Sequence, residues 1–268
     1  GRASRLDPLD TVGMSYPRVD ARERVTGQAH YTGDVTVPEM LYARVLRSPH
    51  PHARITRVDT TRAREMPGVH VVLTREQCDI TWSSGDTHNP RYLFNNPVRF
   101  VGDPVAAVAA IDRHTAEEAI ETIDVDYELL DFVLDQEEAL SSGAIAIQPG
   151  GNLSPRRDGE RLPEIYQRGD LDIGFAASDV VVEETYVSKH HNNAQMEPRS
   201  ALAQWAGNEL TLWSPTQGIF NTRRDMARDL DLLPEQVRVI CQYMGGGFGN
   251  KNQSQDSDLI AAVLAREA

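Results

Sequence analysis

The chain has 268 residues, of which 40% are hydrophobic and 25% charged, so it has a globular composition with room for one large or two medium domains. Its 27 basic and 40 acidic residues give a formal net charge of −13, which repels a polyphosphate backbone and excludes nucleic acid as a partner. The two cysteines, Cys78 and Cys241, support neither a disulfide framework nor a thiolate metal site, so we expect a cytoplasmic, reducing environment.

The longest apolar run, 104–111, is far too short to span a bilayer, so we expect no membrane span. The sequence starts without Met and without the apolar stretch of a signal peptide, and its last segment has a helical pattern with no capping residue after it. We therefore expect a piece of a longer protein.

The first half of the chain alternates short strand-like runs with turn residues. Thr115 and Glu118 have the spacing of a capping box, which predicts a helix of about two to three turns. Apolar residues alternate from Ile123 to Leu129, which predicts a half-buried strand. Earlier strands are predicted at 41–46, 55–59, 69–73 and 105–111. These elements predict a mixed domain of helices and strands over residues 1–140.

Residues 141–168 are rich in glycine, proline and charge and have little periodicity, which predicts a linker. The second unit, 169–268, has a tight hairpin signal at Gly207-Asn208 between two strand-like runs. The elements predicted in it are a short helix ending at Ala177, strands at 180–187, 201–205, 210–213 and 237–243, and helices at 219–230 and 258–268. The fold class predicted for the chain is therefore α+β.

The strongest local feature is the run from Gly245 to Lys251, Gly-Gly-Gly-Phe-Gly-Asn-Lys, between a predicted strand and a predicted helix. Glycines allow positive φ and leave backbone N–H groups that a phosphate or oxo ligand can approach, and the following helix would add its positive N-terminus. A P-loop would need glycine at 250 and a hydroxyl at 252, where this chain has Asn250 and Asn252.

A dinucleotide-binding turn fits no better, because Asn250 follows the glycines and we expect no companion βαβ unit upstream. Taken alone, the run also fits a glycine-rich turn that serves only packing. Both an anion-binding loop and a packing turn therefore remain open on local sequence.

A series of motifs in order resembles the molybdenum hydroxylase family of xanthine dehydrogenase and aldehyde oxidase. The stretches that resemble its α/β hammerhead domain are 25–34, 47–53, 98–106 and 125–128. Gly169-Asp170, Met196-Glu197-Pro198, Thr216-Gln217 and 245–251 then resemble motifs of the first molybdopterin-binding domain, which this chain would hold only in part. The collinear order over nearly the whole chain is more specific than any single motif.

The resemblance implies a molybdenum cofactor, either molybdopterin or its cytosine dinucleotide, with no direct protein ligand to the metal. It implies that Gln217 lies beside an oxo ligand of the metal and that Gly246, Gly247, Phe248 and Gly249 contact the cofactor. The family's catalytic glutamate belongs to a later segment, so no catalytic residue is expected within this chain. A [2Fe–2S] subunit, an FAD subunit and the rest of the molybdopterin subunit are the partners implied.

The implied function is the hydroxylation of an aromatic heterocycle or aldehyde with water as the oxygen source. Two residues are candidates for the substrate side. Asn252 replaces the glutamate of purine-oxidising members, which argues against a purine. Glu197 precedes a proline and so has a restricted backbone, with a structural salt bridge as its competing use. The alternatives are the aryl-CoA reductase branch of the family and a non-catalytic scaffold that docks the catalytic chain.

Two histidine pairs are weaker candidates for a metal site. His190 and His191 would point to opposite faces of a strand and cannot bind one ion together. His50 and His52 would share a face, yet the sequence offers them no third ligand. We expect neither pair to hold a metal.

Overall fold

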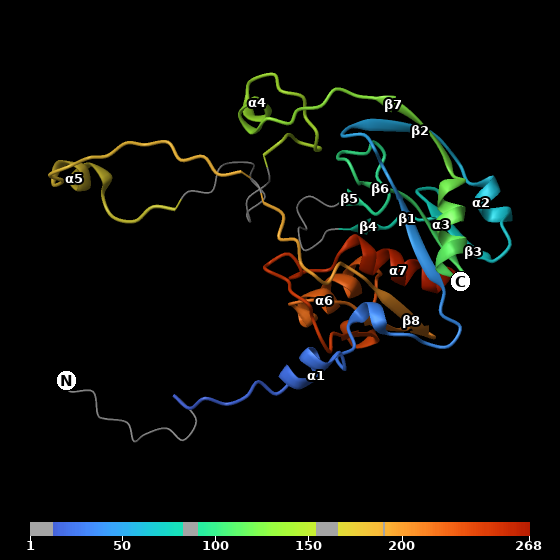
Figure 1. Cartoon of the computed structure of the whole chain (residues 1–268). Coiled ribbons are helices and arrows are strands. Elements are labelled where there is room, and N and C mark those ends of the chain that lie inside the picture. The colour runs from blue at the N-terminus through green and yellow to red at the C-terminus, as the bar shows by residue number, and fades with distance from the viewer. Residues whose placement is uncertain (1–12, 83–90, 154–165, 190) are drawn as a thin grey trace.

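The computed structural model describes residues 13–82, 91–153, 166–189 and 191–268. Helices and strands are mixed along the chain, which confirms the α+β class. Figure 1 shows the strands of the first unit beside the orange and red C-terminal unit, while the N-terminal stretch and the segment around α5 extend away from both. Within these described ranges, no helix has the length and apolar character needed to cross a membrane.

The first unit is built around a three-stranded antiparallel sheet with the order β1-β6-β3. The central strand consists almost entirely of alanine and valine and is buried along its whole length, because a strand covered on both faces has room only for such residues. The strands are β1 (Tyr42–Arg47), β3 (Val69–Thr74) and β6 (Pro104–Ala110), close to their predicted positions.

Two helices and two further strand pairs complete the unit. Helices α2 (Thr61–Glu65) and α3 (Arg113–Glu121) contribute Ala63 and Ala119 to a core with Val72 and Val108 of the sheet. The strand pairs are antiparallel and consist of β2 (Ala53–Asp59) with β7 (Asp124–Leu129) and of β4 (Thr81–Trp82) with β5 (Arg91–Tyr92). A short helix α4 (Gln136–Leu140) ends the unit.

Helix α3 begins before the position predicted for it. Asp112 is its N-cap, and the Asp112 Oδ1 accepts a hydrogen bond from the Thr115 N–H at 2.8 Å. The prediction of a capping box starting at Thr115 was wrong, because the carboxylate three residues earlier satisfies that first-turn donor.

The second unit contains a sheet with the order β10-β9-β8. β8 (Leu202–Ala206) and β9 (Glu209–Trp213) form the predicted hairpin, whereas β10 (Val237–Ile240) pairs parallel to β9 and ends three residues earlier than predicted. Helix α6 (Ile219–Asp229) connects the two parallel strands, so a βαβ unit lies directly before the glycine-rich run. The prediction that no such unit precedes it was wrong, because the pattern of single strands does not reveal which of them pair in parallel.

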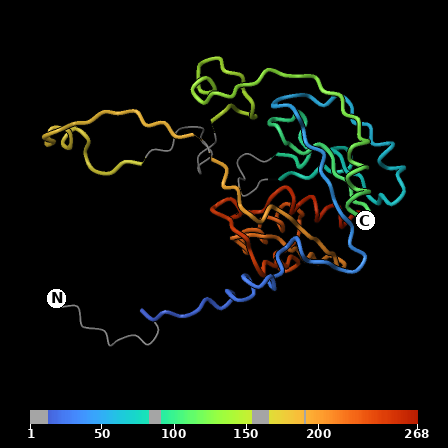
Figure 2. The backbone as a smooth tube through the Cα atoms, in the orientation of Figure 1, coloured from blue at the N-terminus to red at the C-terminus, as the bar shows by residue number. Residues whose placement is uncertain are grey.

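In this structure no strand forms at 180–187, in contrast to the prediction. Residues 166–189, which we call the arm, instead run outward from the body and back, with the single helix α5 (Leu171–Ala176) at the turning point (Figure 2). Every residue of the arm is exposed, and its backbone has no ladder partner among the described residues. A strand needs a neighbour for its hydrogen bonds, which β propensity alone does not supply.

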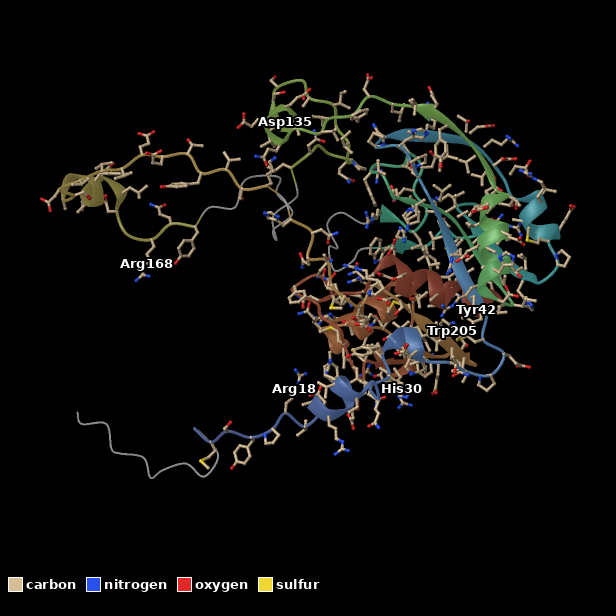
Figure 3. All side chains as sticks on the ribbon, viewed as in Figure 1. Arg18, His30, Tyr42, Asp135, Arg168 and Trp205 are labelled. Carbon is tan, nitrogen blue, oxygen red and sulfur yellow. The ribbon has the colours of Figure 1, made fainter. Side chains whose placement is uncertain are left out.

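The largest hydrophobic core joins the two units. Leu73 and Ala107 of the first sheet lie in the same buried cluster as Leu212 of β9 and Leu259 of α7 (Asp256–Glu267). The Trp205 Nε1–H, labelled in Figure 3, donates to the Ala262 carbonyl of α7 at 2.8 Å. Helix α7 therefore fixes the second sheet against the first through one continuous core.

Helix α7 begins with a buried carboxyl group. The Asp258 Oδ2 accepts the Gln255 N–H at 2.9 Å, and burial raises the pKa of Asp258 from 3.8 to about 6. Because this pKa is higher in the folded than in the unfolded chain, the folded chain holds the proton more tightly, and stability falls as pH rises from about 4 to about 6.

The Asp258→Asn substitution should remove this pH dependence. Asparagine still offers an acceptor to the Gln255 N–H but carries no charge, so the variant should match the parent near pH 4 and exceed its free energy of unfolding by on the order of 2–3 kcal/mol above pH 6. Urea unfolding at pH 4, 5 and 7 measures the difference. A gap between variant and parent that stays constant with pH would contradict the assignment.

Candidate functional site

The glycine-rich run lies where the parallel strands β9 and β10 end. Gln217 follows β9 and the run from Gly245 to Lys251 follows β10, and parallel strands bring their carboxyl ends to the same edge of a sheet. The Gln217 N–H donates to the Lys251 carbonyl at 2.7 Å, and the Thr216 hydroxyl donates to the same oxygen at 3.1 Å. Two motifs that are far apart in sequence therefore form one site.

The side-chain amide of Gln217 has a defined orientation. Its Oε1 accepts from the Gly249 N–H at 3.0 Å and from the Lys251 N–H at 3.3 Å. The Nε2 group consequently faces away from both donors, and it makes no hydrogen bond to any described residue. Because Gln217 is exposed, this NH₂ is an available donor at the surface of the site.

The turn itself has an unusual backbone. Gly246 and Gly249 have φ of +104° and +86°, and Phe248 lies between them with φ +49°, a value that residues with a side chain rarely adopt. The Asn193 Nδ2 donates to the Phe248 carbonyl at 2.7 Å, and the Gln195 Nε2 donates to the Gly247 carbonyl at 2.9 Å. These two amides, which the sequence analysis did not identify, hold the turn in this conformation.

The turn has three consecutive backbone donors without a partner among the described residues, of which the middle one belongs to the buried Gly247. The N–H groups of Gly246, Gly247 and Phe248 make no hydrogen bond to any described residue, whereas the Gly249 N–H is taken by Gln217. Successive backbone N–H groups of this kind form a binding place for anions and oxygen-rich groups. Together with the Gln217 NH₂ and the ring of Phe248, which is 72% exposed, they fit a planar ligand that carries oxygen acceptors.

The glycines serve different purposes. A Cβ on Gly245 would lie 2.5 Å from the Glu197 Cβ, and a Cβ on Gly247 would lie 2.3 Å from the Gln217 Cδ. Gly249 has nothing within 4 Å of its Cβ position and is required only by its φ. Glycine is therefore required at 245 and 247 because a side chain would clash there, and at 246 and 249 because the backbone has a positive φ.

Alanine substitutions should separate these purposes. Gly247→Ala should push Gln217 aside and cost about 3 kcal/mol of stability, whereas Gly249→Ala should cost only about 1–2 kcal/mol for its positive φ. Gly174→Ala, at a site without neighbours in α5, serves as the control and should not destabilise the chain. Thermal unfolding of the three variants tests this order, and equal losses for Gly247→Ala and Gly249→Ala would contradict it.

A buried ion pair supports the turn from behind. The Lys251 Nζ donates to the Glu197 Oε2 at 3.1 Å and to the Glu197 carbonyl at 2.9 Å, and the Gly245 N–H donates to the same Oε2 at 2.7 Å. The two side chains are 2% and 10% exposed. The salt bridge considered for Glu197 is thus present, and Lys251, to which the sequence analysis gave no role, is the cation.

Further contacts hold the outer parts of the run. The Asn252 Nδ2 donates to the Gly249 carbonyl at 3.2 Å, which places Asn252 at the exposed rim. The Arg199 Nη2 donates to the Asn250 carbonyl at 2.6 Å. From helix α1 (Ala21–Thr26), Arg24 donates to the Met244 carbonyl at 3.2 Å. Segments from three parts of the chain therefore fix this loop.

The N-terminus of α6 lies beside the loop as well as that of α7. α7 begins at Asp256, and its first turn carries Asp256 and Asp258, whose carboxyl groups lie at the positive end of the helix. α6 follows Gln217 with Gly218 as its N-cap, and a Cβ at position 218 would lie 2.6 Å from the Asn252 carbonyl oxygen.

The structure gives His50 and His52 contacts with other groups of the chain. The His52 Nδ1 lies 2.6 Å from the Asp131 carbonyl, and the His50 ring packs edge-on against Tyr127. His191 is exposed, and His190 lies outside the described residues. The described residues contain no group of three or more His, Cys, Asp or Glu side chains suited to hold an ion.

Two family models match the chain. Residues 26–131 match the model described as aldehyde oxidase and xanthine dehydrogenase, a/b hammerhead domain, and residues 156–268 match the molybdopterin cofactor-binding domain. The chain is 35% identical, over 95% of its length, to the 6-hydroxypseudooxynicotine dehydrogenase complex subunit gamma of Paenarthrobacter nicotinovorans and covers 33% of it. It is 34% identical, over 90% of its length, to the nicotinate dehydrogenase large molybdopterin subunit of Eubacterium barkeri and covers 55% of it.

A solved structure of an oxidoreductase has the same fold as this chain. The chain superimposes on quinoline 2-oxidoreductase from Pseudomonas putida 86 with a TM-score of 0.80 and 30% identity, covering 95% of this chain and 33% of that one. The chain thus spans about a third of most of these relatives. Because the two family models match consecutive parts of the sequence, the chain belongs to the molybdenum hydroxylase family of xanthine dehydrogenase and aldehyde oxidase.

Proposed function

We propose that the chain is the front part of the molybdenum-cofactor subunit of a multi-component oxidoreductase that hydroxylates an aromatic heterocycle or aldehyde. The observation that carries this proposal is the set of available donors at the end of β9 and β10, namely the Gln217 Nε2 and the N–H groups of Gly246, Gly247 and Phe248. When bound, the molybdenum cofactor supplies two-electron redox chemistry, with water as the source of oxygen.

The residues of this chain bind and orient the cofactor. The Gln217 NH₂ would donate a hydrogen bond toward the metal centre, the unpaired N–H groups of the turn would donate to the cofactor, and the exposed Phe248 ring would pack against it. No metal ligand and no catalytic base come from this chain, and the glutamate base belongs to the remainder of the subunit. We propose that the chain consists of a hammerhead domain at 1–140, a linker at 141–168 and part of the first molybdopterin-binding domain at 169–268.

An aromatic nitrogen heterocycle is the favoured substrate. Relatives of this chain are named for nicotinate and quinoline, which belong to that class. Asn252 lies at the exposed rim and offers an amide where a purine-binding member would offer a carboxylate, and Glu197 is occupied by Lys251, so of the two only Asn252 is proposed to contact substrate.

The partners proposed are a [2Fe–2S] subunit, an FAD subunit and the remainder of the molybdopterin subunit, located in the cytoplasm. Cys78 and Cys241 are both free, which suits a reducing compartment. The cofactor is proposed to be molybdopterin or its cytosine dinucleotide, and release of cytidine monophosphate on acid hydrolysis of the purified enzyme identifies the dinucleotide form.

Elemental analysis of the native assembly tests the proposal. Active preparations should contain molybdenum in proportion to this chain, and oxidised extracts should show pterin fluorescence. A panel of aldehydes and nitrogen heterocycles, with an artificial electron acceptor, then assigns the substrate class. Activity in preparations that lack molybdenum would overturn the proposal, and a metal-free assembly with all subunits present would support the scaffold alternative.

A further inference from the structure

The arm, residues 166–189, is the most apolar exposed part of the described chain. Figure 1 shows it reaching away from the body with α5 at its tip, and in Figure 3 the labelled Arg168 lies on it, far from Trp205 beside the core. Its large apolar side chains are 59–88% exposed: Tyr166, Leu171, Ile173, Phe175, Val180, Val181, Val182, Tyr186 and Val187. Exposure of so many contiguous apolar groups marks a surface that is covered in the working protein.

The hydrogen bonds of the arm all lie within it. The Asp170 Oδ1 caps α5 by accepting the Ile173 N–H at 3.0 Å, and the Ser178 hydroxyl donates to the Gly174 carbonyl at 2.8 Å. No hydrogen bond joins the arm to the rest of the described chain. The backbone after Ser178 therefore has all its donors and acceptors available for pairing with another strand.

The sequence of this segment has the composition of an interior strand. From Val180 to Val187 six of eight residues are β-branched or aromatic, which favours extended pairing. Alternate positions point to opposite faces, so Val180, Val182 and Tyr186 share one face and Val181 and Val187 share the other. Apolar groups on both faces are typical of a strand covered on both sides rather than of an edge strand.

We propose that residues 179–187 form a strand that pairs with the remainder of the molybdopterin subunit, with α5 seated on the same surface. The inference deepens the proposed function, since it assumes the larger subunit. The chain covers about a third of the relatives' length, so the remaining two thirds of such a subunit would pack against this chain. The arm offers unpaired backbone groups and apolar side chains for that contact. The adjacent Glu183 and Glu184 require a facing surface with basic or donor groups.

The pairing differs in kind from the contacts already described. The core that joins the two units is closed by α7, and the arm contributes no residue to it. The arm thus adds nothing to the fold of this piece, and its apolar residues are accounted for only by a partner. Insertion of such a strand supplies main-chain hydrogen bonds for affinity and alternate side-chain pockets for specificity.

Hydrogen–deuterium exchange on the purified native enzyme tests the proposal, whether the remainder of the subunit lies on the same polypeptide or on a companion chain. Amides of 179–187 should exchange at least about 100-fold more slowly than free-peptide rates, as paired strands do. The buried strand β6 gives the reference for full protection, and the exposed amides of Ser142 and Gly143 give the reference for free exchange.

A pair of matched variants adds a second readout. Val181→Asp should lower the melting temperature of the native enzyme by several degrees and restore free exchange in 179–187. Leu134→Asp, at an exposed apolar residue outside the arm, should change neither. Exchange near free-peptide rates in the parent, or equal effects of the two variants, would overturn the pairing. Protection that disappears on dilution, with loss of a dimer mass, would assign the arm to a second copy and also overturn it.

Molybdenum content, measured on the same sample, separates the two proposals. If the sample contains molybdenum while the arm exchanges freely, the pairing is wrong and the proposed function stands. If the arm is protected in an assembly that contains no molybdenum, the pairing stands and the proposed function is wrong.

Discussion

The Gln217→Glu substitution should lower the kcat of the native enzyme about 100- to 1,000-fold without lowering its melting temperature. Glutamate keeps an oxygen that accepts the Gly249 and Lys251 N–H groups, so the turn stays in place. It removes the side-chain NH₂ donor, and with it the hydrogen bond that we propose Gln217 makes to the cofactor. The measurement is steady-state kinetics at matched molybdenum content, together with thermal unfolding.

Two further variants make this result specific. Gln217→Ala removes both the donor and the acceptor, so it should lose activity, stability and part of its bound molybdenum. Gln204→Glu, at an exposed position of β8, introduces the same charge away from the site and should leave all three unchanged. If Gln217→Glu retained parental activity, the amide would have no part in orienting the cofactor.

The Lys251→Met substitution should destabilise the chain by about 3–5 kcal/mol, because it leaves the buried Glu197 carboxylate without its cation. The same change removes the Nζ donor to the Glu197 carbonyl and so loosens the segment around Glu197, which packs behind the turn. This loss is a large part of the total stability of a typical domain. Urea unfolding measures it, and molybdenum retention should fall in parallel.

A double-mutant cycle shows that the cost arises from the uncompensated charge. Glu197→Gln combined with Lys251→Met should recover part of the loss, since no buried charge remains. Arg57→Met, which breaks the exposed pair with Asp126, should change stability little because solvent already screens that pair. If Lys251→Met cost no more than Arg57→Met, the burial of the pair would be without energetic consequence.

Much of the fold follows from local sequence. The short apolar runs at 69–73 and 105–111, the hairpin at Gly207-Asn208 and the helix at 219–230 all appear within one or two residues of their predicted positions. Each of these signals depends on residues that are close in sequence, through side-chain periodicity or through the φ that a turn requires. For the same reason the glycine-rich run was recognisable between a strand and a helix.

Structural features that depend on residues distant in sequence could not be predicted from local sequence patterns. The strand predicted at 180–187 has the right composition, but a strand forms only against a neighbour, and the described chain offers none. The βαβ unit before the loop was missed because parallel pairing of β9 and β10 is a property of the sheet, not of either strand. The cap of α3 was misplaced by a competing carboxylate at Asp112.

The sequence by itself determined the family, the secondary structure near its motifs, and the residues Gln217 and Gly246 to Gly249 as candidates for the site. Only the tertiary structure decided how they work together. The direction of the Gln217 NH₂, the support from Asn193 and Gln195, and the Glu197–Lys251 pair arise from contacts across 32 to 55 positions of chain. The physical reason is that hydrogen bonds and burial act through space, so residues with no shared local pattern define the geometry of the site.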